Sequence, residues 1–145
     1  MLFFNKNKED KKEEYVVIIG CGRLGSKIAN ELSMQGENVQ VIDQHSTSFN
    51  RLDSNFGGLN TVGDAMDLDV LKESRIQDAS AVLVLTNDDN VNHIIAQMAR
   101  TVFGVKNVVL RLNDPEKRCV LEGTNMHVLC PALLSAQEIQ HVLKG

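Results

Sequence analysis

Short apolar runs alternate along the chain with segments in which apolar residues recur at helical spacing. Residues 15–19 and 81–85 are continuous apolar runs rich in β-branched side chains, which is typical of parallel strands buried on both faces. Residues 23–35 and 90–103 carry apolar side chains every three or four positions, which predicts amphipathic helices. Strands that alternate with helices in this way predict a parallel sheet covered on both faces.

The same pattern continues to the end of the chain and predicts six strands in all. Pro115 and Pro131 each stand at the start of an expected helix, where the missing proline N–H costs no hydrogen bond. The further expected strands cover residues 39–42, 59–62, 107–112 and 126–129. Further helices are expected within 46–55 and over 67–73, 114–121 and 131–143. We therefore expect a doubly wound α/β domain over residues 15–145, preceded by a charged flexible tail over residues 1–14.

A glycine-rich turn, Gly20-Cys21-Gly22-Arg23-Leu24-Gly25, joins the first strand to the first helix. In a Rossmann-like fold the first glycine permits the tight turn, the second lets the backbone approach a phosphate, and the third lets helix and strand pack closely. The N–H groups that begin the helix then face the anion. Because the turn follows a strand and opens a helix, it predicts a nucleotide site rather than a purely structural turn.

Asp43 ends the second strand, where a carboxylate accepts hydrogen bonds from both hydroxyls of an adenosine ribose. A carboxylate repels a 2′-phosphate, so we expect NAD(H) or ATP/ADP rather than NADP, with the adjacent Gln44 in the same site. The alternative is that Asp43 is an ordinary turn residue. His45 has no companion at metal-ligand spacing and is expected at the surface.

Arg23 is the unusual member of the glycine turn, because a guanidinium at this position has no packing role. It can make bidentate contact with phosphate. We expect it to respond to the charge or length of the ligand, which makes it the candidate for a contact that differs between two states of the protein. The alternative is an exposed arginine in the first helical turn.

Four further motifs follow the strands and extend the pattern beyond the glycine turn. They are Val62-Gly63-Asp64-Ala65, the segment 71–76 before Ala79, residues 86–92 with the sequence TNDDNVN, and residues 109–113 with the sequence VLRLN. With these motifs the chain, from Tyr15 to about Leu143, resembles the regulatory nucleotide-binding domains of potassium transport systems, the family called TrkA-N, KTN or RCK.

The resemblance and the positions of the motifs imply further ligand contacts. Asp64 would bond to the adenine edge beside the small Ala65, with a simple turn as the alternative. Thr86 and Asn87 would face the same crevice from the other side. The matching arginine of the family lies near the nucleotide, which assigns Arg111 to the site; its alternative is a salt bridge. Asn92 is expected either in the site or as a helix-start residue.

The resemblance also implies partners. Family members form dimers or rings beneath a membrane channel, and most carry a C-terminal domain that has no counterpart before Gly145. We expect a homodimer or a higher ring that controls a membrane-embedded potassium transporter from the cytoplasm. The apolar helix over 131–143 would form the interface, unless it covers its own sheet instead.

The composition narrows the class of function. A net charge of -4 and a pI near 5.5 predict no binding to nucleic acid or to anionic lipid. Apolar runs are too short to span a bilayer, so we expect no direct membrane insertion. The three cysteines, Cys21, Cys119 and Cys130, predict no disulfide framework, and the last two are expected in or near the core.

The sequence favours a sensor over an enzyme. A dehydrogenase needs a region that holds substrate against the nicotinamide, and little chain is left to build one. His93, His127 and His141 lie in no recognisable nucleophile motif. The alternative is a fragment of an NAD-dependent dehydrogenase; a redox-sensing transcription regulator is less favoured because a basic DNA-binding surface is missing.

Overall fold

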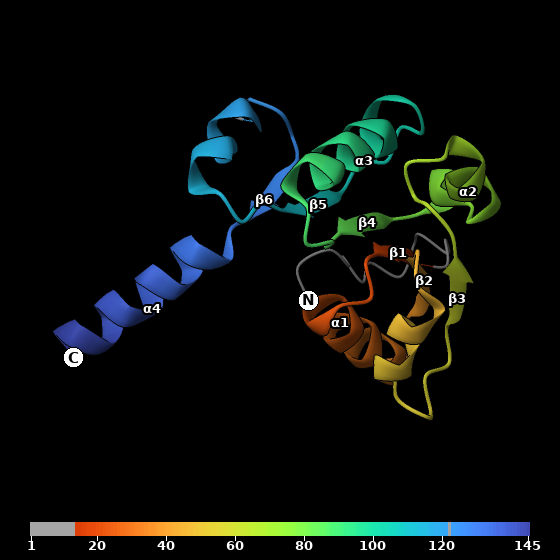
Figure 1. Ribbon diagram of the computed structural model, residues 1–145, viewed down its shortest axis with the longest axis horizontal. Helices are drawn as coiled ribbons and strands as arrows, with labels where there is room; N and C mark the ends of the chain where they lie inside the picture. The colour runs from red at the N-terminus through yellow and green to blue at the C-terminus, as the bar shows by residue number, and fades with distance from the viewer. Residues whose placement is uncertain (1–13, 122) are drawn as a thin grey trace, which may run out of the picture.

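Six parallel strands form one sheet in the computed structural model, which describes residues 14–121 and 123–145 (Figure 1). The predicted tail over residues 1–14 lies almost wholly outside the described residues. The strand order is β3-β2-β1-β4-β5-β6, and every pair of neighbours is parallel. The strands are β1 (Tyr15–Ile19), β2 (Asn38–Asp43), β3 (Leu59–Val62), β4 (Ala81–Val84), β5 (Val108–Arg111) and β6 (His127–Leu129). All six predicted strands are therefore confirmed, as is the Rossmann-like class.

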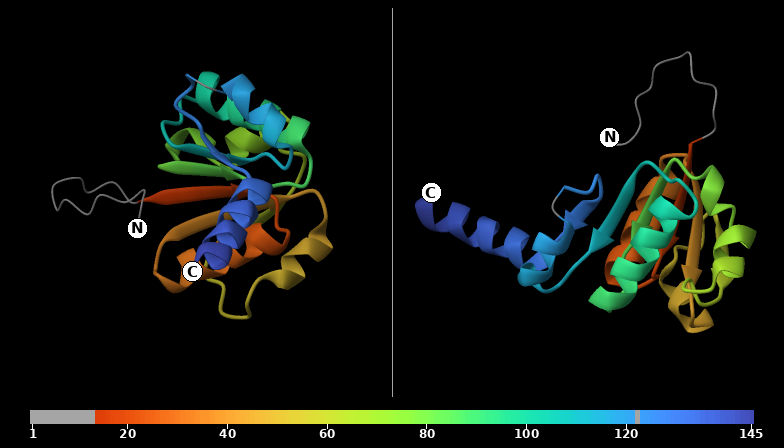
Figure 2. Two further views of the ribbon diagram at one scale, coloured as in Figure 1. Left: turned by 90° about the vertical axis from the view of Figure 1, so that its left-hand side faces the viewer. Right: turned by 90° about the horizontal axis from the view of Figure 1, so that it is seen from above.

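Helices occupy both faces of the sheet, as the sequence predicts (Figure 2). The α-helices are α1 (Arg23–Met34), α2 (Leu68–Glu73), α3 (Asp89–Thr101) and α4 (Pro131–Lys144), and the 3₁₀ segments are η1 (Ser46–Arg51), η2 (Ile76–Asp78) and η3 (Pro115–Leu121). The expected helix over 114–121 is thus a 3₁₀ helix, a form that short connectors often adopt. The expected helix within 46–55 is limited to η1, which ends at Arg51.

The core lies on both sides of the central strands because alternate side chains point to opposite faces. Val16 and Ile18 of β1 pack against α1 through Ala29 and Leu32. Val17 and Ile19 of the same strand pack on the other face, in a cluster that α2 and α3 complete with Leu71, Ile95, Ala96 and Ala99. A strand buried on both faces needs an unbroken apolar run, which is the pattern that residues 15–19 show.

Some apolar residues that the helical pattern placed in the core are exposed instead. Met34, Leu68 and Val102 are 74%, 40% and 57% exposed, because each lies at an end of its helix or just beyond it, where the helix leaves the sheet. Cys130 is buried as expected, but Cys119 is exposed on η3, so its predicted core position is wrong. No described helix is long and apolar enough to cross a membrane.

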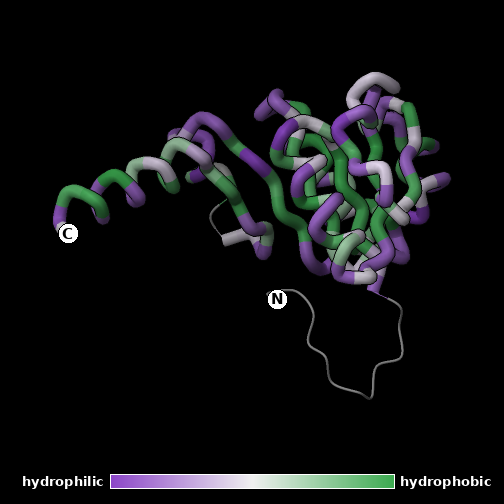
Figure 3. Tube along the Cα trace, turned by 90° about the horizontal axis from the view of Figure 1, so that it is seen from below, coloured by the Kyte–Doolittle hydropathy of each residue, from purple (hydrophilic) through white to green (hydrophobic). Residues whose placement is uncertain are grey.

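The terminal helix α4 extends away from the sheet (Figures 1 and 2). None of its residues is buried, and Leu134, Ile139, Val142 and Leu143 are 50% to 74% exposed. Figure 3 shows apolar positions recurring along this projecting helix. The expectation that α4 covers its own sheet is therefore wrong, and its role in an interface stays a prediction.

The buried amide of Asn92, on the first turns of α3, joins the carboxyl ends of two neighbouring strands. Its Nδ2 donates to the carbonyl oxygens of Thr86 (2.9 Å) and Arg111 (2.8 Å), and its Oδ1 accepts from the Thr86 N–H (3.1 Å) and hydroxyl. The side chain is completely buried, so these bonds are shielded from water. Asn92 thus fixes the chain that follows β4 and β5.

We predict that Asn92→Ala lowers the free energy of unfolding by about 2 to 4 kcal/mol, because it leaves buried backbone groups without partners and opens a cavity. Urea denaturation measures this change. Asn90→Ala on the exposed side of the same helix is the matched control, with an expected change within about 0.5 kcal/mol. Equal losses for the two variants would contradict the role given to Asn92.

Candidate functional site

A cavity of about 1070 Å³ opens at the carboxyl ends of the strands. Its lining comes from the segments that follow β1, β2, β3, β4 and β5, so it extends across both halves of the sheet. The strand order reverses between β1 and β4, and this switch point is where ligands bind in open α/β sheets. The position of the cavity therefore agrees with a nucleotide site.

The first and third glycines of the turn are required by the fold itself. Gly20 has a φ of 98°, and a Cβ there would lie 2.9 Å from the Thr86 nitrogen of the neighbouring segment. A Cβ on Gly25 would overlap the carbonyl oxygen of Gly20, so α1 could not pack this closely on β1. Gly22 differs, because a Cβ there meets no atom within 4 Å and the residue lines the cavity. Of these three glycines, only Gly22 is not required by the packing of the protein, so a ligand can be the reason for a glycine there.

The other members of the turn lie outside the cavity. Cys21 is buried in the core against the α1 face, and burial, followed by the nearby Asp43 carboxylate, raises the pKa of its thiol. Arg23 is exposed at the start of α1, and neither it, Leu24 nor Gly25 lines the cavity. Arg23 and Leu24 therefore do not face the cavity in this structure, and their contacts with a ligand stay a prediction.

Asp43 lines the cavity together with Gln44, but its carboxylate already holds the backbone. Oδ2 accepts the Cys21 N–H at 2.8 Å, and Oδ1 accepts the His45 N–H at 2.9 Å. The carboxylate therefore ties the end of β2 to the glycine turn. A carboxylate has about four lone-pair sites, so each oxygen retains capacity for a ribose hydroxyl.

Asp64 and Ala65 line the cavity after β3, on the side where the adenine is expected. Asp64 Oδ1 accepts the Met66 N–H at 2.9 Å, so the residue does form a turn as its alternative role proposed. Ala65 is 5% exposed, and its small side chain takes up little space in the cavity wall. Both residues line the cavity, and their contacts with adenine stay a prediction.

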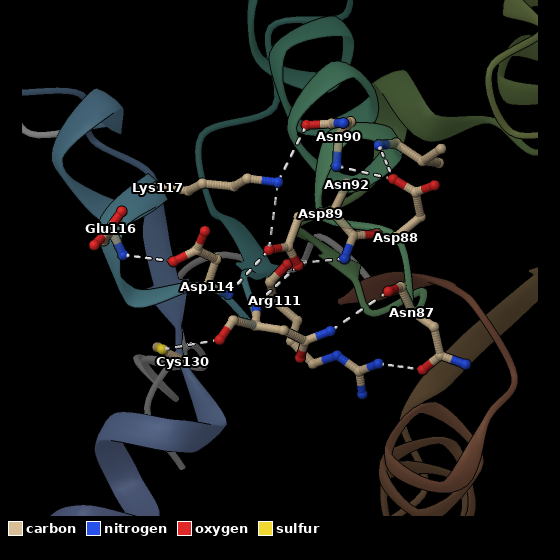
Figure 4. A network of polar contacts seen from close by, with 12 residues as sticks. Asn87, Asp88, Asp89, Asn90, Asn92, Arg111, Asp114, Glu116, Lys117 and Cys130 are labelled. Carbon is tan, nitrogen blue, oxygen red and sulfur yellow. Dashed lines mark hydrogen bonds and ion pairs between the residues drawn. The ribbon is translucent and has the colours of Figure 1, made fainter.

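Thr86 and Asn87 line the opposite side, whereas Arg111 does not line the cavity. Figure 4 shows the Arg111 guanidinium directed toward Asn87. The Arg111 Nη2 donates to the Asn87 Oδ1, and the Arg111 Nε is buried without a hydrogen-bond partner among the described residues. Within those same residues Arg111 forms no salt bridge, so it acts on the cavity through Asn87. Asn92 holds the scaffold, as described above, and does not line the cavity.

Asp89 and Lys117 are cavity residues that the sequence did not single out (Figure 4). The Asp89 carboxylate accepts the N–H groups of Asn113 (2.7 Å) and Asp114 (3.0 Å), and Lys117 Nζ lies 3.8 Å from its Oδ2. Burial raises the pKa of Asp89, but the two N–H bonds, then Lys117 and Arg111, outweigh it, so the pKa falls below its ordinary value. The partners of Asp89 are too distant in sequence for a local pattern to reveal them.

All five aspartates of the cavity wall accept backbone N–H groups. Besides those described, Asp88 accepts from Asn90 and Val91, and Asp114 accepts from Glu116. These bonds hold the loops that follow the strands in place. The fixed positive charges in the wall are those of Arg51 and Lys117. The cavity wall is therefore predominantly negative.

Comparison with known proteins places this architecture in a family. The TrkA-N domain family matches residues 16–131. The chain is 47% identical over 125 residues to the Trk system potassium uptake protein TrkA of Streptomyces coelicolor, a match that covers 86% of this chain and 56% of that protein. The chain thus spans about half the length of the related protein.

Two solved structures share the fold of this chain over most of its length. The GsuK channel bound to NAD is 26% identical, with a TM-score of 0.77 over 94% of this chain and 24% of that chain. The NAD(P)-binding domain of an exopolyphosphatase-related protein from Archaeoglobus fulgidus is also 26% identical, with a TM-score of 0.74 over 91% of this chain and 98% of that chain. The match to the family model covers most of the sheet and the whole cavity, and the chain belongs to the TrkA-N domain family.

Proposed function

We propose that this domain is a cytoplasmic regulatory subunit, or part of one, of a potassium uptake system. It binds NAD(H) or ATP/ADP in the cavity and controls a membrane-embedded transporter through a change of conformation. The cavity carries this proposal, because it lies at the switch point of the sheet around an unobstructed Gly22. The names of the related TrkA proteins and of the NAD-bound GsuK channel support it.

The ligand is proposed to lie across the cavity with its adenine on the β3 side and its other end on the β4 side. Adenine would contact Asp64 and Ala65, the ribose would bond to Asp43, and the phosphates would reach Gly22 and the first N–H groups of α1. The remainder of a dinucleotide would extend past Thr86 and Asn87. The side chains of this assignment line the cavity, and the N–H groups of α1 come from the glycine turn beside it.

We infer that the domain senses its ligand rather than transforms it. A general acid or base must be free to exchange a proton with the substrate. The cavity aspartates are instead engaged with backbone N–H groups, an arrangement that stabilises the loops. No observation favours the dehydrogenase fragment over a sensor.

The chain offers a route from the ligand to a partner. Asp89, in the cavity wall, holds the N–H groups of Asn113 and Asp114, which begin the segment leading through η3 and β6 to α4. A ligand that binds more tightly to one arrangement of this segment shifts the population of states. The exposed apolar side of α4 would transmit the shift to a second copy of the domain or to the transporter.

We predict that NAD, NADH, ATP or ADP raises the melting temperature of the purified chain, because a ligand of the folded state stabilises it by mass action. NADP is expected to give a smaller shift at the same concentration, since its 2′-phosphate would face Asp43. Differential scanning fluorimetry measures both. Failure of all four nucleotides would reject the proposed binding.

Gly22→Ala tests the site without disturbing the fold. The added methyl group meets no protein atom, and Gly22 is the N-cap of α1, so the unfolding free energy is expected to fall by no more than about 1 kcal/mol. It would project where the phosphates approach, and we expect at least about a tenfold loss of nucleotide affinity, equivalent to about 1.4 kcal/mol. Isothermal titration calorimetry gives the affinity. Gly57→Ala, whose new Cβ would lie 3.6 Å from the Ser33 Oγ, is the control and should bind normally.

The regulatory role is tested in cells that lack the gene for this chain. We expect a slower initial rate of potassium uptake from low external potassium, measured by ⁸⁶Rb⁺ influx. The wild-type gene and Gly57→Ala should restore the rate, whereas Gly22→Ala should not, although it accumulates to the same level. Equal restoration by Gly22→Ala would show that nucleotide binding is not used in control.

A further inference from the structure

Two polar side chains, Tyr15 of β1 and Gln40 of β2, are buried together outside the cavity. They are 7% and 8% exposed. The Tyr15 hydroxyl bonds to the Gln40 Oε1 (2.7 Å) and to the carbonyl oxygen of Ser74 (2.6 Å). The Gln40 Nε2 donates to the Thr61 Oγ1 at 2.7 Å. Buried polar groups cost free energy unless they are hydrogen-bonded, so the groups of this pair hold their partners in fixed places.

The bonds of the Tyr15–Gln40 pair reach both ends of one segment of the cavity wall, residues 61–74. Thr61 lies in β3, just before the turn on the side of the cavity where adenine is expected. Ser74 is the C-cap of α2, the helix that follows this turn. The segment therefore leaves the buried pair, passes the cavity and returns to the same pair.

Contacts inside the segment connect Ser74 with the cavity. The Ser74 hydroxyl donates to the Val70 carbonyl oxygen at 2.9 Å. The Val70 side chain packs on Gly63, where an added Cβ would lie 3.0 Å from the Val70 Cγ1. Gly63 lines the cavity directly before Asp64, and its N–H donates to the Asp43 carbonyl oxygen at 2.9 Å. The position of α2 thus sets the position of the turn that carries Asp64.

Arg75, which directly follows the segment, is held by the same tyrosine. Its guanidinium carbon lies 5.0 Å from the centroid of the Tyr15 ring, in the range of a cation–π contact. Its backbone has a φ of 53°, a left-handed conformation that residues other than glycine adopt rarely and that surrounding contacts must hold. Tyr15 therefore fixes the end of α2 in two ways, through its hydroxyl and through its ring.

We propose that Tyr15 and Gln40 are positioning residues for the adenine wall, the pair Asp64 and Ala65, and so set how strictly the cavity selects adenine. The inference rests on the proposed nucleotide site and adds to it two residues that control base specificity from outside the cavity. Adenine would donate its amino group to the Asp64 carboxylate, whereas hypoxanthine presents a carbonyl oxygen there. A correctly placed carboxylate therefore favours ADP over IDP, and a displaced one loses that preference.

Tyr15→Phe tests the role of the pair, because it removes the hydroxyl and keeps the ring beside Arg75. Isothermal titration calorimetry gives the affinities for ADP and IDP. We expect wild type to prefer ADP and Tyr15→Phe to lower the ADP to IDP affinity ratio at least about threefold, since a hydrogen bond to a charged group contributes more than that. Thr61→Val keeps the branched shape, removes the bond at the other end of the segment and should lower the ratio as well. It keeps the test decisive if Tyr15→Phe does not fold.

Ser80→Ala is the matched control. The Ser80 Oγ accepts the Tyr15 N–H at 3.2 Å and donates to the Tyr15 carbonyl oxygen at 2.9 Å, and both bonds lie outside residues 61–74. This variant loosens the start of β1 without releasing the segment, so the affinity ratio should stay unchanged. Hydrogen exchange without ligand gives an independent measure: amides of residues 61–74 should exchange faster in Tyr15→Phe and Thr61→Val than in Ser80→Ala.

The outcomes separate this proposal from the nucleotide site on which it rests. If wild type binds neither ADP nor IDP, the proposed site fails and this inference fails with it. If wild type binds both equally, or if Tyr15→Phe and Thr61→Val keep the wild-type preference, the site stands and the positioning role is overturned. An equal loss of preference in Ser80→Ala would also overturn it, because general loosening of β1 would then explain the effect.

Discussion

The site depends on one buried amide. Asn92 bonds to backbone groups of Thr86 and Arg111, and in doing so it fixes the separation of the two segments that form the far wall of the cavity. The residues just beyond the strands still bond to neighbouring strands, as the Leu85 N–H does to Ile19 and the Leu112 N–H to Leu129. An amide can supply both donors and an acceptor, so one side chain holds backbone groups of two segments. The bonds from Asp89 to Asn113 and Asp114 hold the same two segments at a second place.

Carboxylates in the cavity wall also bond to backbone groups of neighbouring segments, as the Asn92 amide does. Asp43 connects the end of β2 to the glycine turn, and Asp89 connects the start of α3 to the segment after β5. Each aspartate thus performs two tasks, because its oxygens hold a loop while its charge contributes to the potential inside the cavity. The charge that a ligand meets is consequently set by the same groups that shape the site. A substitution that removes charge but keeps an acceptor oxygen separates the two effects.

The proposed connection between the cavity and the exposed helix α4 follows the order of segments along the chain. Asp89 binds the beginning of the segment that passes through η3 and β6 into α4, and α4 has no buried residue of its own. In the proposed sensor, a ligand at Asp89 would act on this segment and through it on the direction of α4. The central strands, whose side chains pack on both faces, need no large rearrangement.

The sequence by itself determined the six strands, the helices α1 and α3, and the glycine turn. These features depend on residues close together in the chain: an unbroken apolar run for a buried strand, helical spacing for a helix, and glycine where no Cβ fits, as at Gly20 and Gly25. The sequence also placed Asp43, Asp64, Ala65, Thr86 and Asn87 at the strand ends, where the cavity wall includes them.

Tertiary structure decided the rest. Whether Arg111 meets a carboxylate or Asn87, and whether Asn92 holds a ligand or the scaffold, depends on groups brought together by the sheet order. Asp89 meets the N–H groups of Asn113 and Asp114, and Lys117 reaches it, because β5 lies beside β4. The direction of α4, which has no buried residue, was likewise not evident from its apolar spacing. Local patterns record the preferences of neighbouring residues. The partner of a polar side chain is set by contacts between segments far apart in the chain, and those exist only once the sheet has formed.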